Sequence, residues 1–163
     1  MDDLIYPLKA AAVGTAILCG FIIGIERQLS GKAAGIRTSI LICMGAYFFT
    51  AISGVISAEA DPAKVIGQIV TGIGFIGAGV IIGREGIVLG VTTAAVIWVL
   101  AAIGIIIGLE KYLAAILVSV LTVTLLTGVT VLENIFNSLQ RGVHKRLTRE
   151  KKKYNHDKTA KQL

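Results

Sequence analysis

Five long runs of apolar residues constrain this chain more than any other feature of its sequence. A transmembrane helix needs about 20 apolar residues, because each residue advances about 1.5 Å and the hydrocarbon core is about 30 Å thick. Five stretches meet this requirement, namely residues 4–25, 38–58, 65–82, 87–107 and 112–132. The sequence therefore predicts an all-α, polytopic membrane protein with five transmembrane helices. The short connections predict that consecutive helices are antiparallel.

The composition excludes an ordinary soluble domain. The chain has 163 residues, 55% of them hydrophobic and 16% charged, and its mean hydropathy is +0.80. A soluble domain of this size cannot bury so much apolar surface. We predict a transmembrane domain over residues 1–132 and a basic, amphipathic and flexible cytoplasmic tail over residues 133–163. Asp2 and Asp3 precede the first run, where a signal peptide has basic residues, so we expect this run to be retained.

Lysine and arginine residues are distributed unevenly between the two predicted sides of the membrane. Arg27, Lys32 and Arg37 follow the first run, Arg84 follows the third, and nine more lie between Arg141 and the end of the chain. Cytoplasmic loops carry such an excess, so we expect the N-terminus outside and the tail in the cytoplasm. A basic tail after an apolar body favours anionic lipid as its partner over nucleic acid.

The stretch "TGIGFIGAG" at residues 71–79 contains a G-x-G-x-x-G pattern that has three interpretations. A dinucleotide-binding loop needs a preceding strand, a following helix and an acid about 20 residues later, and residues 92–98 offer no acid. We therefore interpret the glycines as packing residues in the middle of an apolar span. A third interpretation stays open, because short, glycine-interrupted spans mark binding regions in some transporters.

The packing interpretation predicts that this span is gripped by neighbouring helices on two sides. Small residues let helix backbones approach closely, which favours association in lipid. The predicted packing residues form two faces, which are Gly67, Thr71, Gly74 and Ala78 on one and Gly72, Gly79 and Gly83 on the other.

Several polar residues within or beside the apolar runs are candidates for binding an ion or a partner. Asp61 is a suitable N-cap, followed by Pro62 at the first helical position. Gln68 lies about two turns further on, where its amide needs a partner in protein or water. Thr92 and Thr93 form a second polar spot, within the fourth run.

The most polar part of the membrane domain is "GIERQLSGKAAGIRTSI" at residues 24–40. Glu26 and Arg27 end the first run and Arg37 and Thr38 open the second, so we expect a contact between Glu26 and Arg37. One interpretation is charge anchoring at the cytoplasmic face with a helix cap at Thr38. The other is an ion, phosphate or partner site that uses Glu26 as acceptor and the two arginines as donors.

Enzymatic, cofactor and metal chemistry are not expected. No two carboxylates share the middle of a predicted span, so a buried magnesium cage is not supported. Cys19 and Cys43 lie within apolar runs and are expected to behave as small hydrophobic residues. Both histidines, His144 and His156, lie in the tail, and no pairing of a nucleophile with a base is visible.

Three segments resemble the MgtC/SapB family of bacterial inner-membrane proteins. They are "GIERQLSGKAAGIRTSIL" at 24–41, "DPAKVIGQIVTGIGFIGAGVI" at 61–81 and "GVTTAAVIWVLAAIGIIIGLEKY" at 90–112, in matching order and spacing. The resemblance implies a five-span domain and a role in growth at low magnesium, acid tolerance and survival of pathogens inside macrophages. It also implies that members restrain other membrane machines, including the ATP synthase and cation-transporting ATPases.

By motif position, the resemblance carries over a set of polar and small residues. This set comprises Glu26, Arg27, Lys32, Gly35, Arg37, Thr38, Asp61, Gln68, Thr92 and Thr93. The chain departs from the family at Gln28, where a second Glu is frequent, and at Leu89, where a basic residue is frequent. Many relatives also continue into a soluble C-terminal domain.

Two functions from different classes follow. We favour a non-enzymatic regulator that binds other membrane proteins through a glycine-lined helix face. The alternative is a small oligomeric carrier or channel for Mg²⁺, H⁺ or a phosphate-linked ion, with Gln68, Thr92 and the Glu26–Arg37 mouth along its path. The small-residue faces also suggest a homodimer, either as part of these functions or as a purely structural scaffold.

Overall fold

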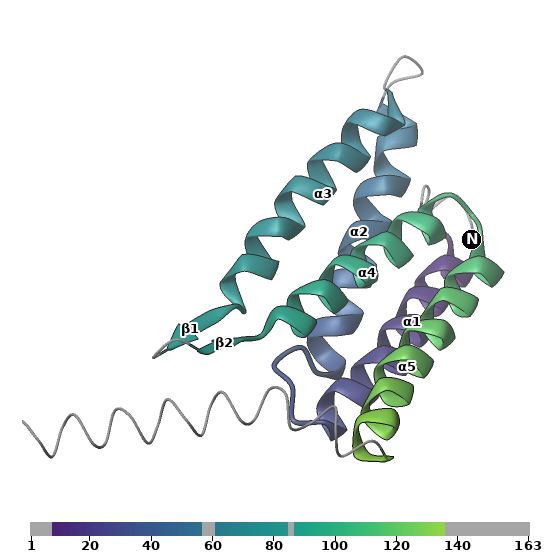
Figure 1. Cartoon of the computed structure of the whole chain (residues 1–163). Helices are drawn as coiled ribbons and strands as arrows, with labels where there is room; N and C mark the ends of the chain where they lie inside the picture. The colour runs from purple at the N-terminus through teal and green to yellow at the C-terminus, as the bar shows by residue number, and fades with distance from the viewer. Residues whose placement is uncertain (1–7, 57–60, 85–86, 136–163) are drawn as a thin grey trace, which may run out of the picture. The chain divides into compact units, whose positions relative to one another are not determined.

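The computed structural model describes residues 8–56, 61–84 and 87–135. Within them the element order is α1 (Ala10–Leu29), α2 (Ile36–Ile56), α3 (Pro62–Gly79), β1 (Ile82–Arg84), β2 (Ile87–Leu89), α4 (Val91–Gly108) and α5 (Tyr112–Ile135). Successive helices run in opposite directions, as Figure 1 shows for α1 to α4. The predicted all-α class and the alternation of helix direction are confirmed.

Four of these helices are long and apolar enough to cross a membrane, and α3 is apolar but shorter. The predicted third span, 65–82, begins and ends earlier as α3, and the predicted fourth span, 87–107, begins later as α4. Residues 82–84 and 87–89 form a small antiparallel hairpin instead, which pairs Ile82 with Leu89 and Gly83 with Val88. Branched residues such as isoleucine and valine favour strands, so an apolar run alone did not reveal this hairpin.

Both ends of the link between α3 and α4 have a local chemical cause. Asp61 caps α3, because its side chain accepts a hydrogen bond of 2.9 Å from the backbone N–H of Ala63, as predicted. Gly90 precedes α4 with a φ of +89°, and a Cβ there would lie 2.0 Å from the carbonyl oxygen of Val80. Only glycine satisfies both the left-handed backbone and this close approach.

The centre of the bundle is α2, which α1 and α4 approach closely. A Cβ on Gly20 or Gly24 of α1 would lie 2.6 Å from the Cα of Ile40 or Ile36. On α4, a Cβ on Gly104 would lie 2.3 Å from the carbonyl oxygen of Cys43. The core between these helices is apolar, and its largest fully buried side chains include Ile23, Ile97, Leu100, Ile103 and Ile107. Both cysteines are buried and free, as expected for small hydrophobic residues.

The glycines predicted to pack α3 against its neighbours do not do so within this chain. Among the described residues, nothing lies within 4 Å of a Cβ built on Gly67, Gly72, Gly74, Gly79 or Gly83. Thr71 and Ala78 are exposed, and α3 packs instead through the opposite side, where Gly77 is buried near Ala94. The prediction that neighbours in the chain grip this helix on two sides is therefore wrong. These small residues are not covered by another helix of this chain, because α3 lies at the edge of the bundle (Figure 1).

The turn between α4 and α5 holds Glu110 at a φ of +63°, and Glu110 is the one described non-glycine residue with a positive φ. Its carboxylate accepts a hydrogen bond of 2.6 Å from Lys9 Nζ, which raises the pKa of Lys9. Both side chains are more than half exposed. We expect Glu110→Gly to change the thermal unfolding midpoint little, because loss of an exposed ion pair is offset by relief of the left-handed backbone. A large drop would show that this pair holds the N-terminal end of α1 in place.

The chain divides into two compact units after Thr124. In the second unit, the described residues continue α5 as helix to Ile135. Residues 136–163, which contain most of the predicted basic tail, lie outside the described residues, as do residues 1–7. Binding of the tail to anionic lipid therefore stays a prediction.

Candidate functional site

The C-terminal end of α1 holds a cluster of three polar side chains, of which Glu26 and Arg27 are buried and Ser30, at the C-cap, is exposed. Arg27 Nη2 donates a hydrogen bond of 2.6 Å to Glu26 Oε1, and Arg27 Nε donates a second bond to Glu26 Oε2. Ser30 Oγ donates a third bond of 2.9 Å to Glu26 Oε1. Glu26 is 9% exposed and Arg27 4% exposed. The carboxylate is thus held by three donors from its own segment of chain, and its charge is matched by the adjacent guanidinium.

One atom of this cluster has no partner. Arg27 Nη1 is buried and has no hydrogen-bond acceptor in the described part of the chain. An unpaired donor on a buried cation is unfavourable, because its hydration is lost without replacement. The arginine is therefore held in place mainly by Glu26, and the stability of this end of α1 depends on the pair.

The prediction that Glu26 contacts Arg37 is wrong. Close packing at Gly24 brings the backbone of Ile36 against α1, so that the first turn of α2 faces α1 through Ile36 and Ser39. Arg37 lies about 100° further around the helix and is exposed, as is Thr38. Arg27, rather than the predicted Arg37, is the arginine that is bonded to the carboxylate of Glu26.

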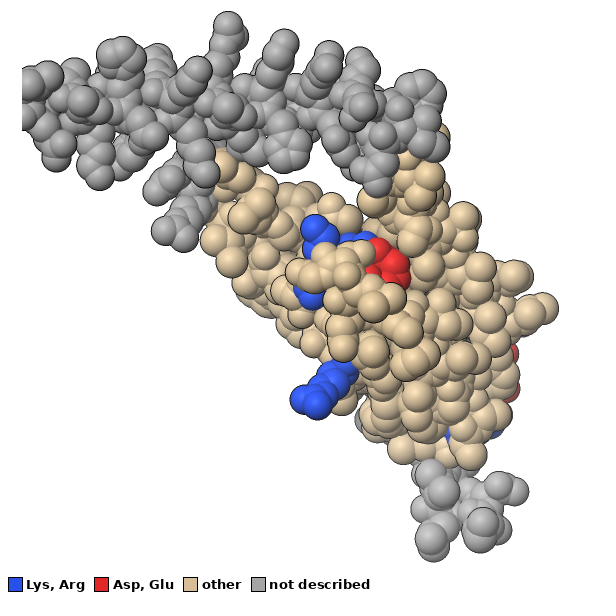
Figure 2. Space-filling model, turned by 90° about the horizontal axis from the view of Figure 1, so that it is seen from below, with Lys and Arg blue, Asp and Glu red and all other residues tan. Residues whose placement is uncertain are grey.

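The loop between α1 and α2 covers this cluster. The backbone N–H of Lys32 donates to the carbonyl of Arg27 at 2.9 Å, and Gly31 turns the chain with a φ of +64°. The Lys32 side chain is exposed. Figure 2 shows this end of the molecule, with one red acidic patch beside blue basic side chains in a mostly tan surface. Because Arg27 neutralises the carboxylate of Glu26, the exposed Lys32 and Arg37 give this loop region a positive net charge.

The other predicted site residues do not join this cluster. Asp61 is used as a helix cap, and Gln68 lies exposed on α3. Thr92 is exposed and Thr93 is buried in the first turn of α4. The structure therefore brings Glu26 and Arg27 together but distributes the remaining candidates over separate elements.

Three buried hydroxyl groups elsewhere in the bundle are satisfied by their own helices. Thr50 Oγ1 donates to the carbonyl of Ala46, Ser53 Oγ to that of Thr50, and Ser119 Oγ to that of Ala115, each at 2.8 Å. Such bonds occupy the donor of each hydroxyl within its own helix. These residues therefore serve helix packing better than a path for ions.

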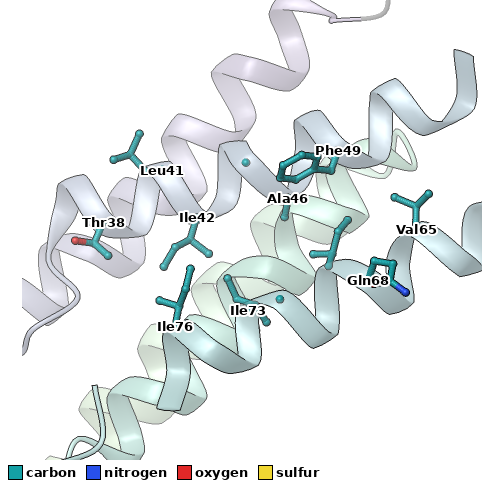
Figure 3. Close-up of a pocket in the computed structure, with 12 residues that line it drawn as sticks. Thr38, Leu41, Ile42, Ala46, Phe49, Val65, Gln68, Ile73 and Ile76 are labelled. Carbon is teal, nitrogen blue, oxygen red and sulfur yellow. The ribbon is translucent and has the colours of Figure 1, made fainter. Parts of the chain in front are cut away.

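An apolar groove of about 550 Å³ lies between α2 and α3. Figure 3 shows Gln68 and Val65 at one end of this groove and Thr38 near the other. Most of its lining is apolar, namely Leu41, Ile42, Ala46, Phe49, Val65, Ile69, Ile73 and Ile76, with Gly45 and Gly72. The groove was not predicted, because it depends on the angle between α2 and α3, which no local pattern specifies.

A smaller cavity of about 360 Å³ lies at the other end of the bundle, between the start of α1 and the ends of α2 and α4. The hydroxyl of the buried Tyr47 accepts a hydrogen bond of 2.9 Å from the backbone N–H of Lys9. The pair of Lys9 and Glu110 lies at its rim. Among the described residues, no group of three or more His, Cys, Asp or Glu side chains is placed to hold a metal ion.

Comparison with known proteins connects this fold to one family. The sequence profile of the MgtC family matches residues 13–135. The chain is 48% identical over 119 residues to a protein of Escherichia coli K12 named "Putative magnesium transporter YhiD", covering 68% of this chain and 55% of that protein.

Proteins named MgtC show the same relationship. The chain is 38% identical over 135 residues to Protein MgtC of Brucella abortus, covering 82% of this chain and 57% of that protein. It is 45% identical over 98 residues to Protein MgtC of Salmonella typhimurium, covering 60% of this chain and 42% of that protein. The chain thus spans about half the length of these curated relatives. No solved structure matches it.

Proposed function

This chain belongs to the MgtC family, and from that premise we propose that it is a non-enzymatic protein of the bacterial inner membrane that acts in magnesium homeostasis by regulating other membrane proteins. Adaptation to acid and to life inside host cells belongs to the same proposal, through the family resemblance. The regulation is exerted by contact between helices in the plane of the membrane. The name of the Escherichia coli relative supports the connection with magnesium. Because that name describes a transporter, transport is the competing function.

The observation that carries the preference for a regulator is the state of Glu26. A hard cation needs several oxygen ligands, and the carboxylate of Glu26 already accepts hydrogen bonds from Arg27 and Ser30. A cation at this mouth would have to displace a buried guanidinium whose side-chain hydrogen bonds within the described residues all go to Glu26. That exchange is unfavourable, because it leaves a second buried charge unpaired.

The apolar surface of the bundle supports contact with other helices. Leu41 and Phe49 line the groove between α2 and α3 while remaining mostly exposed, and Ile76, which also lines it, is about half exposed. A groove of this character accepts a helix or a lipid tail more readily than a hydrated ion.

The proposal predicts no ion flux from the protein alone. Purified protein in liposomes is expected to pass Mg²⁺, phosphate and protons no faster than protein-free liposomes do. In inverted bacterial membrane vesicles, the same preparation is expected to lower ATP-driven proton pumping, because an ATP-dependent membrane machine is the class of target that the resemblance implies. The measurement combines fluorescent ion indicators in the liposomes with a pH-sensitive dye in the vesicles.

The competing function has a distinct signature in the same assay. Reproducible flux that Gln68→Leu removes and Thr71→Val leaves intact would establish a carrier and refute the regulator. Thr71→Val is the matched control, because Thr71 lies one turn away on α3 and its hydroxyl already donates to the carbonyl of Gly67.

A further inference from the structure

One face of α3 is uncovered in this chain, although the helix is part of the bundle. Ile66, Ile69 and Ile73 pack against the cluster of Ala46, Ala101 and Ile105 from α2 and α4. The rest of the helix surface is exposed, and we call it the outer face of α3. Its residues are Gln68, Thr71, Gly72, Phe75 and Gly79. Gln68 and Gly72 lie at its edge, where they also line the groove between α2 and α3. Because α3 packs beside α2 and α4, this face lies at the level of their apolar segments.

Gln68 places an amide without a hydrogen-bond partner among the described residues on the outer face. It is exposed, and none of the described residues forms a hydrogen bond with its side chain. It lies one turn, about 6 Å, deeper along α3 than the exposed Lys64, which is suited to the membrane surface. In hydrocarbon an amide with two donors and one acceptor needs a polar partner, and a lipid tail has none.

The shape of the outer face complements itself. Phe75 projects from it and is 78% exposed, against 49% for Ile76. One turn before Phe75 lies Gly72, where a Cβ would meet open space and which lines the groove of about 550 Å³. One turn after it lies Gly79, also next to open space. A projecting ring and adjacent hollows on one helix face fit a second copy of that same face.

We propose that the outer face of α3 is the interface of a homodimer, in which Gln68 of each copy is hydrogen-bonded to Gln68 of the other and Phe75 of each packs over the partner's Gly72. The amide side chain selects a second copy as the occupant, because two amides related by a two-fold axis supply each other with a donor and an acceptor. A lipid tail fills the groove without satisfying the amide. This inference stands apart from the proposed function, since a regulator and a carrier are both compatible with it.

The full chain in liposomes tests the proposal. Protein labelled at its amino terminus is reconstituted over a range of protein-to-lipid ratios, and self-association is measured by single-molecule photobleaching. Wild-type protein is expected to be dimeric except at high dilution in lipid. Gln68→Leu should weaken the dimer about tenfold, because interhelical hydrogen bonds in membranes contribute about 1–2 kcal/mol in model peptides. Gly72→Leu should weaken it at least as much by filling the hollow.

Thr71→Val is the matched control and should leave the dimer unchanged. Its hydroxyl donates to the carbonyl of Gly67 at 2.9 Å and is not available to a partner. All three variants should keep the thermal unfolding midpoint of the wild-type monomer. A Cβ at Gly72 meets open space, the amide of Gln68 has no hydrogen-bond partner among the described residues, and Thr71 bonds only within its own helix. That measurement separates a lost interface from a lost fold.

Three results would overturn the proposal. The first is a wild-type protein that stays monomeric at every lipid ratio. The second is a dimer that neither Gln68→Leu nor Gly72→Leu weakens. The third is a monomer that retains a lipid in native mass spectrometry and loses it in Gly72→Leu, which would assign the groove to lipid.

Discussion

Adding one methyl group at Gly104 is expected to destabilise the bundle by about 3 kcal/mol or more, because the methyl carbon of Gly104→Ala would lie 2.3 Å from the carbonyl oxygen of Cys43 and 2.7 Å from Ala46 Cβ. The first of these atoms is backbone, so the contact is relieved only by moving α4 away from α2. That movement weakens the core around Leu100 and Ile103, both of which are fully buried. The measurement is the unfolding midpoint of the purified protein in mild detergent, followed by circular dichroism.

Gly74→Ala is the matched control for this prediction. Gly74 lies in the glycine-rich stretch of α3, and its methyl group would meet nothing within 4 Å in the described structure. Alanine is a better helix former than glycine by about 1 kcal/mol, so this variant should be as stable as the wild type or slightly more stable. Equal damage from the two substitutions would refute the assignment of close packing to α4.

Removing the guanidinium of Arg27 is expected to have the second large effect. Arg27→Leu leaves the buried carboxylate of Glu26 with only the hydroxyl of Ser30 as donor. Breaking a buried ion pair from one side is destabilising by about 3–5 kcal/mol, because the remaining charge is uncompensated. We expect a lower unfolding midpoint in detergent and, if the family role applies, poorer growth of cells at low Mg²⁺.

A double substitution distinguishes the pair from a general effect of mutation in this turn. Glu26→Gln combined with Arg27→Met removes both charges and should recover most of the stability lost by Arg27→Leu. Arg37→Gln should leave stability unchanged, because Arg37 is exposed and apart from the cluster. A strong effect of Arg37→Gln, with a mild effect of Arg27→Leu, would restore the contact first expected from the sequence.

The glycines illustrate how far sequence patterns predict packing. Glycines are most dense at residues 71–79, but the helical glycines in closest contact with another helix are Gly20 and Gly24 on α1 and Gly104 and Gly108 on α4. Both pairs have the G-x-x-x-G spacing that marks close helix packing in membranes. This spacing is visible in the sequence as "GFIIG" at 20–24 and "GIIIG" at 104–108. It was overlooked because glycines are more frequent at residues 71–79.

The candidate site was predicted in part for a similar reason. Residues 24–40 were singled out as the most polar part of the membrane domain, and the structure pairs Glu26 with Arg27 there. The Asp61 cap was predicted from the local pattern. The partner of Glu26 was not predicted correctly. Arg27 and Arg37 are chemically equivalent, and only the path of the loop between α1 and α2 determines which of them reaches Glu26. Gln68 was recognised as an amide that needs a partner, but its position on an uncovered face required the arrangement of three helices.

The sequence by itself determined that this chain forms apolar helices of membrane-spanning length and where α3 begins, because hydrophobic length and helix capping are local properties of the chain. Only the tertiary structure decided which glycines touch a neighbouring backbone, which arginine neutralises Glu26, and which face of α3 stays uncovered. Those outcomes depend on how helices distant in sequence are placed, and a glycine suits close contact and open space equally well.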